Sequence, residues 1–465
     1  MPEPPKSQIG AKLYGTRPAY GGSAPANFTM ASIDPARHLP DNRAIMPVEA
    51  PPKSIPVVNP APKDAPARTE VQSLYDQYVV NTVNRGLTIV RGKGARAWDD
   101  QGRAYLDLGG GVAVNSLGHA HPAIAEVLAK QAGTLIHSSN LYYNEQQGRL
   151  AKRMVELTGP GKVFFCNSGA EANEALIKLA RKFGHKNGAD GSRYEIITAK
   201  NSFHGRTMAT LAATGQDKIK QGFDPLLPGF VHVPFNDLAA VEAAITPKTV
   251  AVQIEGIQGE GGVNVATPEY LLGLRALTKK HGLLLLWDGV QDGYFRTGRW
   301  QAYERILEDV AGGENFLPDA IAMAKSLGAG YPIGAVWIRE PYSNVFTPGS
   351  HGTTFGGSPL ACAVALTVLD VVEREKLAAN IRARGEELKR GLQSLVGTRG
   401  IEAVRGYGGL IGLVVADEPA SVIERLALGG LILIPAANHT VRFLPPLNVT
   451  AEEIAEALRI VAEAL

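Results

Sequence analysis

Three stretches each place a residue with useful chemistry at the end of a predicted strand. Ser168 and Gly169 follow the apolar KVFFC, Asp288 ends LLLLW, and Lys325 ends AIAMA. A glycine turn that opens a helix offers backbone N–H groups to a phosphate. A lysine in a water-poor pocket has a lowered pKa and becomes a nucleophile toward an aldehyde. Each residue also has an ordinary explanation, as a helix-capping serine, a turn aspartate or a solvated lysine.

Together these residues meet the needs of one cofactor, pyridoxal phosphate (PLP). PLP needs a phosphate seat, an acid facing its ring nitrogen and a lysine for its aldehyde. The acid keeps the nitrogen protonated, so the ring can take up electrons from a substrate carbanion. Ligands of α/β sheets bind beyond the carboxyl ends of the strands, where all three groups fall. The combination therefore predicts a PLP site.

The elements that must position these groups alternate from about residue 75 onward. Apolar strands followed by amphipathic helices predict an α/β fold with a mostly parallel central sheet. The predicted strands are 162–167, 194–199, 229–235, 249–255, 283–288, 320–324 and 333–338. After residue 358 the pattern changes to a helix, long or broken, over 359–397, then to strands at 408–417 and 431–436 and a helix at 450–465. This predicts a smaller α+β C-terminal domain.

The N-terminal part differs from the rest, because residues 1–70 hold 14 of the chain's 30 prolines. Such a density excludes regular helix and sheet, so we expect a disordered tail or an extended arm. The predicted divisions are a Pro-rich extension (1–75), a segment that packs with the small domain (76–130), a large PLP-binding domain (131–345) and a C-terminal small domain (346–465).

Composition excludes several classes of protein. The chain has 47 basic and 45 acidic residues and a net charge of +2, which disfavours nucleic acid or an acidic membrane as partner. Two cysteines cannot make a disulfide framework in 465 residues, which favours a reducing compartment. The first residues, MPEPPKSQIG, lack a secretory pattern, and no apolar run could span a bilayer. We expect a cytoplasmic protein without a metal site.

Seven motifs occur together in one known family. They are YLDLGGGVAVNSLGHAHP (105–122), HSSNLYYNEQQ (137–147), NSGAEANEAL (167–176), FHGRT (203–207), IQGEGGV (257–263), HGTTFGGSPLACAVA (351–365) and VRFLPPLN (441–448). In these motifs the chain resembles the class III PLP aminotransferases of fold type I, the aspartate-aminotransferase fold. It is most similar to acetylornithine and ornithine aminotransferases, from about residue 76 to the C-terminus.

The resemblance implies catalytic roles for Lys325 and Asp288 and a cofactor contact for Gln291. Lys325 binds the cofactor's aldehyde and, once the substrate displaces it, moves the proton between substrate and cofactor. Asp288 pairs with the ring nitrogen, and Gln291 hydrogen-bonds the ring hydroxyl.

The same resemblance assigns the rest of the cofactor site. Gly169 and Ala170, with Ser168 nearby, give N–H groups to the phosphate. Phe203 stacks on the ring, although an ordinary core phenylalanine is the alternative. The adjacent His204 receives no role.

Charged residues are assigned to the substrate by the resemblance. Arg206 binds a substrate carboxylate, a task that suits its planar fork, although a surface arginine on a loop is the alternative. Glu260 holds Arg442 while an ω-amino substrate binds and releases it for the dicarboxylic partner. Thr354 reaches the cofactor phosphate, and Thr353 the substrate, across a dimer interface. The implied homodimer shares its active sites, so a monomer would be nearly inactive.

The chain departs from the family pattern beside these motifs. Gly256 stands where the family usually has proline, and Gly289 where an acid lies near the cofactor in relatives. Asp292 replaces a threonine, and Ser326 a glycine. The lost acid and the new one raise the question of an altered substrate choice or rate.

The resulting interpretation is a PLP-dependent transaminase of arginine biosynthesis. It moves the amino group of an ω-amino donor, foremost N2-acetylornithine, to 2-oxoglutarate by a ping-pong mechanism. Other donors stay open, namely ornithine, 4-aminobutyrate and succinyldiaminopimelate, as do a PLP isomerase of the same fold and a degenerate non-catalytic relative. The retained Arg206 and the Glu260–Arg442 pair favour transamination over isomerisation, and Lys325 and Asp288 weigh against the degenerate relative.

Overall fold

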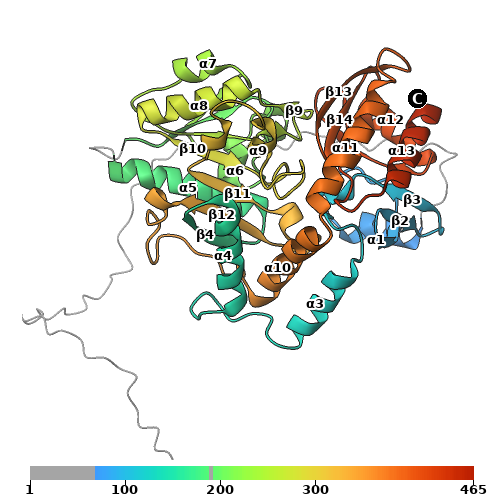
Figure 1. Cartoon of the computed structure of the whole chain (residues 1–465), viewed down its shortest axis with the longest axis horizontal. Coiled ribbons are helices and arrows are strands. Elements are labelled where there is room, and N and C mark those ends of the chain that lie inside the picture. Colours follow the sequence, from blue (N-terminus) through green and yellow to red (C-terminus); the bar gives the residue numbers. More distant parts are fainter. Residues whose placement is uncertain (1–68, 188–191) are drawn as a thin grey trace, which may run out of the picture. The chain divides into compact units, whose positions relative to one another are not determined.

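The structure is a computed structural model that describes residues 69–187 and 192–465. The predicted Pro-rich extension (1–75) lies almost wholly outside the described residues. Its last residues belong to the first described helix, α1 (Glu70–Tyr78). Figure 1 shows the described chain from this helix to the C-terminus.

The largest sheet has seven strands and holds the predicted chemistry at one edge. In spatial order it comprises β4 (Gly161–Cys166), β12 (Gly334–Arg339), β11 (Ala320–Met323), β10 (Leu284–Asp288), β7 (Thr249–Ile254), β5 (Glu195–Ala199) and β6 (Phe230–Val233). Within this sheet β12 alone runs antiparallel to its neighbours, β11 and β4. The mostly parallel sheet predicted from the sequence is therefore confirmed. Strands β7, β10 and β11 are buried at every residue, as expected of a sheet covered on both faces.

Helices cover both faces of this sheet (Figure 1). They are α4 (Glu145–Thr158), α5 (Gly169–Asn187), α6 (Met208–Ala213), α7 (Leu238–Ala243), α8 (Pro268–His281) and α9 (Ala302–Ile306). Along β10, Leu284 and Leu286 pack in the apolar cluster of α5, whereas Leu285 and Trp287 pack in the cluster that contains α8. Because side chains alternate along a strand, Asp288 faces the α5 side.

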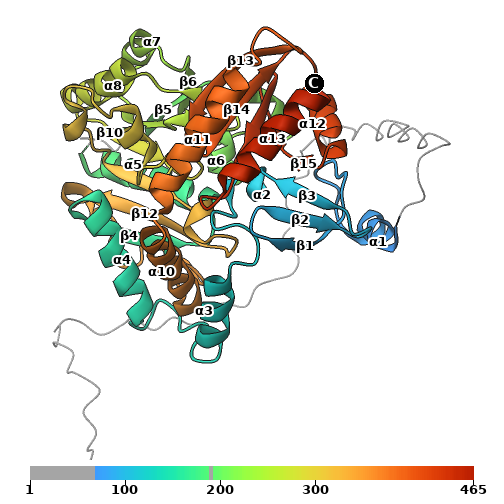
Figure 2. The same ribbon diagram turned by 45° about the vertical axis from the view of Figure 1, so that its right-hand side comes forward.

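The C-terminal part builds a second, antiparallel sheet. Its order is β13 (Ile401–Tyr407), β14 (Leu410–Val415), β17 (Thr440–Phe443) and β16 (Ile434–Ala436). Figure 2 shows α11 and α13 beside this sheet. The helices of this part are α10 (Pro359–Arg374), α11 (Leu377–Gln393), α12 (Pro419–Leu428) and α13 (Ala451–Ala464). The helix predicted over 359–397 is broken, because Lys376 between α10 and α11 has a left-handed φ of 54°.

A third sheet joins the two ends of the described chain. Its order is β1 (Ile89–Lys93), β2 (Arg96–Asp99), β3 (Ala104–Asp107) and β15 (Leu431–Ile432), and β15 pairs in parallel with β3. The predicted strand 431–436 is therefore two strands in two different sheets. Nearby lie α2 (Gly110–Ala113) and α3 (Pro122–Ala132), and a small hairpin is formed by β8 (Ile257–Gln258) and β9 (Asn264–Val265). The domain boundaries at 75, 130 and 345 stay predictions.

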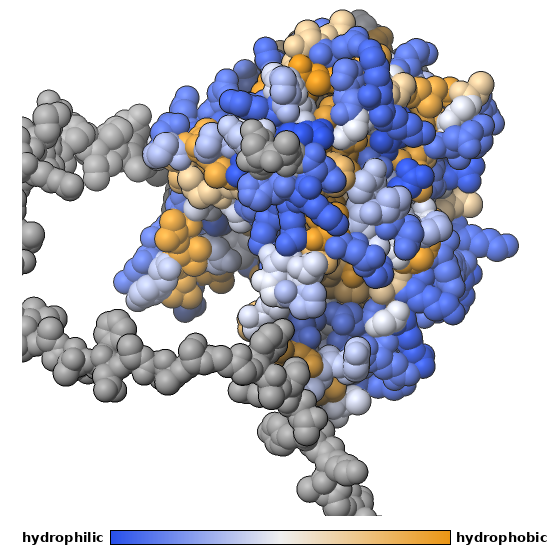
Figure 3. All heavy atoms as spheres, turned by 90° about the vertical axis from the view of Figure 1, so that its left-hand side faces the viewer, coloured by the Kyte–Doolittle hydropathy of each residue, from blue (hydrophilic) through white to orange (hydrophobic). Residues whose placement is uncertain are grey.

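The surface of the described part is mixed in character. Figure 3 shows one face that is mostly hydrophilic, with hydrophobic side chains in separate small groups. Strongly exposed apolar side chains occur at Leu141, Tyr142, Tyr143 and Phe355. Among the described residues no helix combines the length and the apolar character that crossing a membrane requires.

Candidate active site

A cavity of about 400 Å³ opens beyond the carboxyl ends of β4, β7, β10 and β11. It brings together most of the residues singled out in the sequence. Those that line it are Ser168, Gly169, Ala170, Phe203, Arg206, Glu260, Asp288, Gln291 and Lys325. The remainder of the wall is largely apolar, with Val114, Tyr331 and Ile333. This is the usual composition of a small-molecule site, with a few polar groups placed in an apolar wall.

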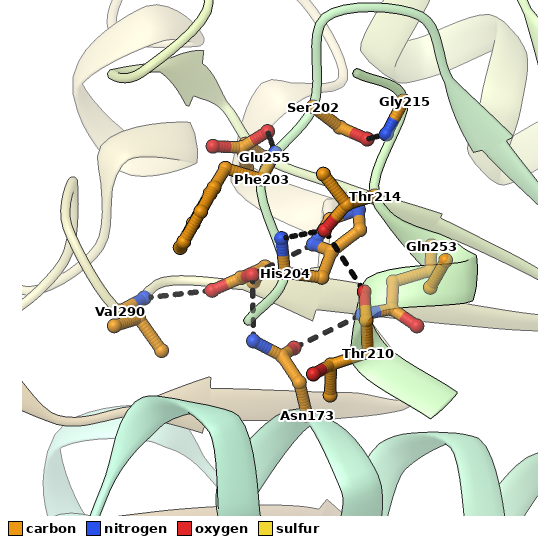
Figure 4. Close-up of polar contacts among 12 residues, drawn as sticks. Asn173, Ser202, Phe203, His204, Thr210, Thr214, Gly215, Gln253, Glu255 and Val290 are labelled. Carbon is orange, nitrogen blue, oxygen red and sulfur yellow. Dashed lines mark hydrogen bonds and ion pairs between the residues drawn. The ribbon is translucent and has the colours of Figure 1, made fainter. Parts of the chain in front are cut away.

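Asp288 is the last residue of β10 and is held by three donors. Asn173 Nδ2 lies 2.8 Å and His204 Nδ1 2.7 Å from Asp288 Oδ2, and the Val290 N–H donates to Oδ1 at 3.1 Å. Figure 4 shows the Asn173 and His204 side chains and the Val290 N–H directed at one carboxylate, with Gln253 bonded to Asn173. These bonds fix the direction in which the carboxylate faces the cavity.

His204, for which no role was predicted from the sequence, is thus part of the site. Its side chain is fully buried, and its Nε2 has no hydrogen-bond partner among the described residues. Its ring lies against an aspartate 84 positions further along the chain. The only sequence signal was its place in the FHGRT motif, beside Phe203.

Lys325 follows β11 and opens a short 3-10 turn, Lys325–Leu327. Its backbone has a left-handed φ of 46°, which is uncommon for a residue with a side chain. Burial lowers the pKa of the Lys325 amine to about 8, while the neighbouring Glu260 and Asp288 charges oppose this shift. A substantial neutral fraction near pH 8 makes this amine a competent nucleophile.

The start of α5 forms the expected anion seat. Ser168 Oγ accepts the Glu171 N–H at 3.2 Å, so the serine also caps the helix. The first N–H groups of a helix, here those of Gly169 and Ala170, have no acceptor within it. A Cβ at position 169 would lie 2.7 Å from a Val290 methyl carbon, which explains why glycine is required there. Backbone donors and the helix dipole together suit a phosphate.

Phe203 and Arg206 form another part of the wall. The Phe203 N–H donates to Glu255 Oε2 at 3.2 Å, and Arg206 Cζ lies 5.4 Å from the centre of the Phe203 ring. Burial, followed by the Asp288 charge, raises the pKa of the Glu255 carboxyl well above its ordinary value. Arg206 is exposed and has no ion-pair partner among the described residues. It is therefore available to a ligand carboxylate.

Arg442, on β17, binds Glu260 and Gln291, and these two residues line the cavity. Its Nη1 lies 2.7 Å from Glu260 Oε1 and its Nη2 2.8 Å from Glu260 Oε2, a two-pronged pair. Gln291 Oε1 accepts from Nη1 at 2.8 Å, and the Pro435 carbonyl accepts from Nη2 at 2.9 Å. Burial alone would raise the pKa of Glu260, but the charge and hydrogen bonds of Arg442 lower it.

The departures at 256 and 289 lie outside the cavity wall. A Cβ at Gly256 would lie 2.4 Å from the Trp287 ring, and one at Gly289 would lie 2.5 Å from Gln301 Oε1. The buried Asp292 accepts the Ile257 N–H at 2.9 Å, and burial raises its pKa to about 8. Other side chains thus fill the space of the missing ones. None of these residues lines the cavity, so the changes have no direct contact through which to alter substrate choice.

Thr353 and Thr354 do not line this chain's cavity. Thr353 Oγ1 accepts from Asn167 Nδ2 at 3.4 Å and from the Gly356 N–H at 3.2 Å. Thr354 is exposed on the same loop. Their predicted reach into a second chain's site stays a prediction.

Comparison with known proteins identifies the family. The chain matches the family described as aminotransferase class-III over residues 78–465. The chain is a class-III aminotransferase. It is 48% identical to the acetylornithine aminotransferase of Caldanaerobacter subterraneus, over 84% of this chain and 97% of that protein. It is 44% identical to the succinylornithine transaminase of Yersinia pseudotuberculosis, over 83% and 94% of the two chains.

Solved structures agree with this aminotransferase in fold. The ornithine aminotransferase of Toxoplasma gondii has a TM-score of 0.80 at 35% identity and covers 86% of this chain and 95% of its own. The acetylornithine aminotransferase of Elizabethkingia anophelis has a TM-score of 0.74 at 32% identity and covers 85% and 97%. The predicted family, fold type I and PLP dependence are confirmed.

The residues present also fit PLP by their chemistry. The cavity offers backbone donors at the start of α5 at one end, a lysine amine of lowered pKa, and a buried carboxylate held in place by Asn173, His204 and Val290. These are the three groups that the cofactor requires.

Proposed function

We propose that this aminotransferase moves the amino group of an acylated ornithine, foremost N2-acetylornithine, to 2-oxoglutarate in two half-reactions. The observation that carries the proposal is the unequal state of the two arginines. Arg442 is neutralised by Glu260, whereas Arg206 has no ion-pair partner among the described residues. The resting cavity therefore suits a donor with one carboxylate and an uncharged acyl group.

The acceptor poses the opposite requirement, because 2-oxoglutarate carries two carboxylates. One binds Arg206, and the other needs Arg442, so Glu260 must withdraw. The Glu260 side chain is 26% exposed and can turn away, whereas the Arg442 side chain is 3% exposed. Gln291 Oε1 and the Pro435 carbonyl retain one N–H on each terminal nitrogen of Arg442. The two N–H groups that Glu260 frees then face a carboxylate as a pair.

The chain's own residues divide the catalytic work. When bound, PLP supplies an aldehyde that takes the donor's amino group and a ring that accepts electron density. With the cofactor bound, Lys325 would take the proton from the donor carbon that bears the amino group and would carry it to the cofactor. Asp288 holds the proton of the ring nitrogen, and the bonds from His204 and Asn173 keep its carboxylate directed there.

The proposal extends to assembly and compartment. We propose a cytoplasmic homodimer in which Thr353 and Thr354 complete the partner's site. Thr354 is exposed, as is the adjacent Phe355 with 65% of its surface, and both lie on a loop that does not line this chain's own cavity. Exposed aromatic side chains beside a polar loop are typical of an interface. Two buried free cysteines suit a reducing compartment.

A screen of the first half-reaction tests the donor. The PLP-loaded enzyme is mixed with acetylornithine, succinylornithine, ornithine, 4-aminobutyrate or lysine, and the bleaching of its visible absorbance is followed. Bleaching is expected to be fastest with the acylated ornithines, and 2-oxoglutarate should restore the colour. Fastest bleaching by 4-aminobutyrate or lysine would contradict the proposed donor. Product formation that needs no keto acid would identify an isomerase instead.

A further inference from the structure

Ser326, next to Lys325, ties the lysine to a distant segment. Its side chain is buried with 2% exposure, and its Oγ donates to the Ala113 carbonyl at 3.0 Å. In the opposite direction, Ser116 Oγ donates to the Ser326 carbonyl at 2.9 Å. Two hydrogen bonds therefore lock the residue that follows the reactive lysine onto the segment 113–116.

That segment is an unusual piece of backbone. The residues of α2, Gly110–Ala113, all have positive φ, between 54° and 65°, and include the β-branched Val112. Left-handed backbone is costly for residues with a Cβ and persists where the surroundings fix it. Here Asp107 Oδ1 accepts the N–H groups of Gly109 and Gly110, both at 3.0 Å. The next residue, Val114, lines the active-site cavity.

Two left-handed segments thus face each other across the serine. Lys325 has a φ of 46° and Ala113 a φ of 65°. Neither conformation is favoured by its own residue, so contacts between the two segments must hold them. A glycine at position 326 could supply no side-chain bond.

Arg296 supports this contact from behind. Its fully buried guanidinium donates from Nη2 to Ser326 Oγ at 3.4 Å and to the Ala113 carbonyl at 3.5 Å, and from Nη1 to the Gly409 and Pro445 carbonyls. It has no carboxylate partner among residues 69–187 and 192–465. Burial lowers its pKa only to about 10, so it stays charged at neutral pH. The cation therefore joins neutral acceptors from the lysine turn, α2 and the C-terminal part.

We propose that Ser326, supported by Arg296, is a positioning residue that fixes the Lys325 backbone against the Ala113–Val114 wall of the cavity. A shift of this wall then also moves the Lys325 backbone, and with it the position of the lysine amine. The inference rests on the proposed role of Lys325.

The first test uses the apoenzyme and does not depend on activity. Ser326→Ala removes the hydroxyl, Ser326→Thr retains it, and Ser343→Ala removes a buried serine hydroxyl that bonds the Glu340 carbonyl elsewhere. Amide hydrogen exchange of peptides covering 110–117 is measured by mass spectrometry. We expect exchange about fivefold faster in Ser326→Ala, and wild-type rates in the other two variants. Unchanged exchange in Ser326→Ala would overturn the inference.

The second test asks whether the contact positions the lysine. For PLP-loaded Ser326→Ala, the limiting rate constant of the first half-reaction is expected to be about tenfold lower than in wild type. The apparent dissociation constant of the donor should stay within about twofold of wild type. The pH midpoint of the visible absorbance should also shift, and Ser326→Thr should restore both. Faster amide exchange with an unchanged limiting rate constant and an unchanged pH midpoint of the absorbance would leave Ser326 a structural residue and overturn its positioning role. Failure of every donor in the screen would refute the proposed function while leaving the exchange result as it stands.

Discussion

Two side-chain pairs at the cavity, Asp288–His204 and Glu260–Arg442, are built in opposite ways. The Asp288 and His204 side chains are 3% and 0% exposed, and Asp288 is held by three donors from three separate positions. In the second pair Arg442 is 3% exposed but Glu260 is 26% exposed. The pair proposed to keep one state is sealed on both sides, whereas the pair proposed to exchange partners leaves one member near solvent. Burial thus differs in the way that the proposed division into a permanent and an exchangeable contact requires.

The largest expected effect lies between the two pairs, at Lys325. Replacing Lys325 with alanine should lower turnover by at least about 10³-fold, because among the described residues no other amine lines the cavity. The fold should be retained. Steady-state rates and circular dichroism check this, with Lys279→Ala on the exposed side of α8 as the control. Near-wild-type activity in Lys325→Ala would refute its assignment.

The lysine also affects the stability of the apoenzyme. Its folded-state pKa of about 8 lies below its ordinary value of 10.5, so the unfolded chain binds the proton more tightly. The free energy of unfolding should therefore rise with pH between about 8 and 10.5. Urea titrations at pH 8 and pH 10.5 measure this rise, which Lys325→Ala should lack. An equal rise in the variant would contradict the lowered pKa of Lys325.

The next largest effect concerns the sealed pair. Asp288→Asn should slow both half-reactions by about 10²-fold or more, because the ring nitrogen loses its anion. His204→Gln, which can still donate a hydrogen bond, should slow both by about tenfold or less. Stopped-flow absorbance of each half-reaction measures these rates. A loss confined to one half-reaction would break the contrast between the two pairs.

The exchangeable pair should respond in one half-reaction only. Glu260→Gln leaves Arg442 charged beside the donor, so the donor KM should rise about tenfold. The KM for the keto-acid acceptor should be unchanged or lower, since no carboxylate has to leave. Both Michaelis constants, measured on one preparation, give the ratio directly. Equal changes in both would show that Glu260 does not discriminate between the substrates.

The smallest effect is expected at Asp292, which lies behind the cavity, and it concerns the stability of the protein. Its folded-state pKa of about 8 lies above its ordinary 3.8, so the folded state keeps a proton that the unfolded state has lost. The contribution of Asp292 to the free energy of unfolding therefore falls as the pH rises from about 4 to 8. Asp292→Asn should raise Tm by about 3 °C at pH 8 and leave it unchanged near pH 4. A Tm shift that is the same at both pH values would contradict the buried proton.

The sequence predicted the elements better than the contacts between them. Apolar strands and turn residues located β10 and β11, and with them Asp288 and Lys325. The stretch 431–436 was predicted as one strand, because six apolar residues in a row cannot show that β15 and β16 join different sheets. Sequence spacing alone likewise gave no sign that His204 meets Asp288.

The departures from the family pattern show the same limit. From the sequence, Gly289 could only be described as a lost acid. In the fold, Gln301 Oε1 occupies the space that a side chain at 289 would need. Such replacement between residues 12 positions apart depends on packing, which a single sequence does not reveal.

The split of 431–436 between two sheets constrains how this enzyme can be engineered. Leu431 and Ile432 pair with β3, Ile434 starts β16, and the Pro435 carbonyl binds Arg442. One added or deleted residue would turn the side chains of β16 to the opposite faces of that strand and carry the Pro435 carbonyl away from the arginine. Loop-length libraries should leave this stretch untouched and vary 309–315 instead, where most residues are exposed.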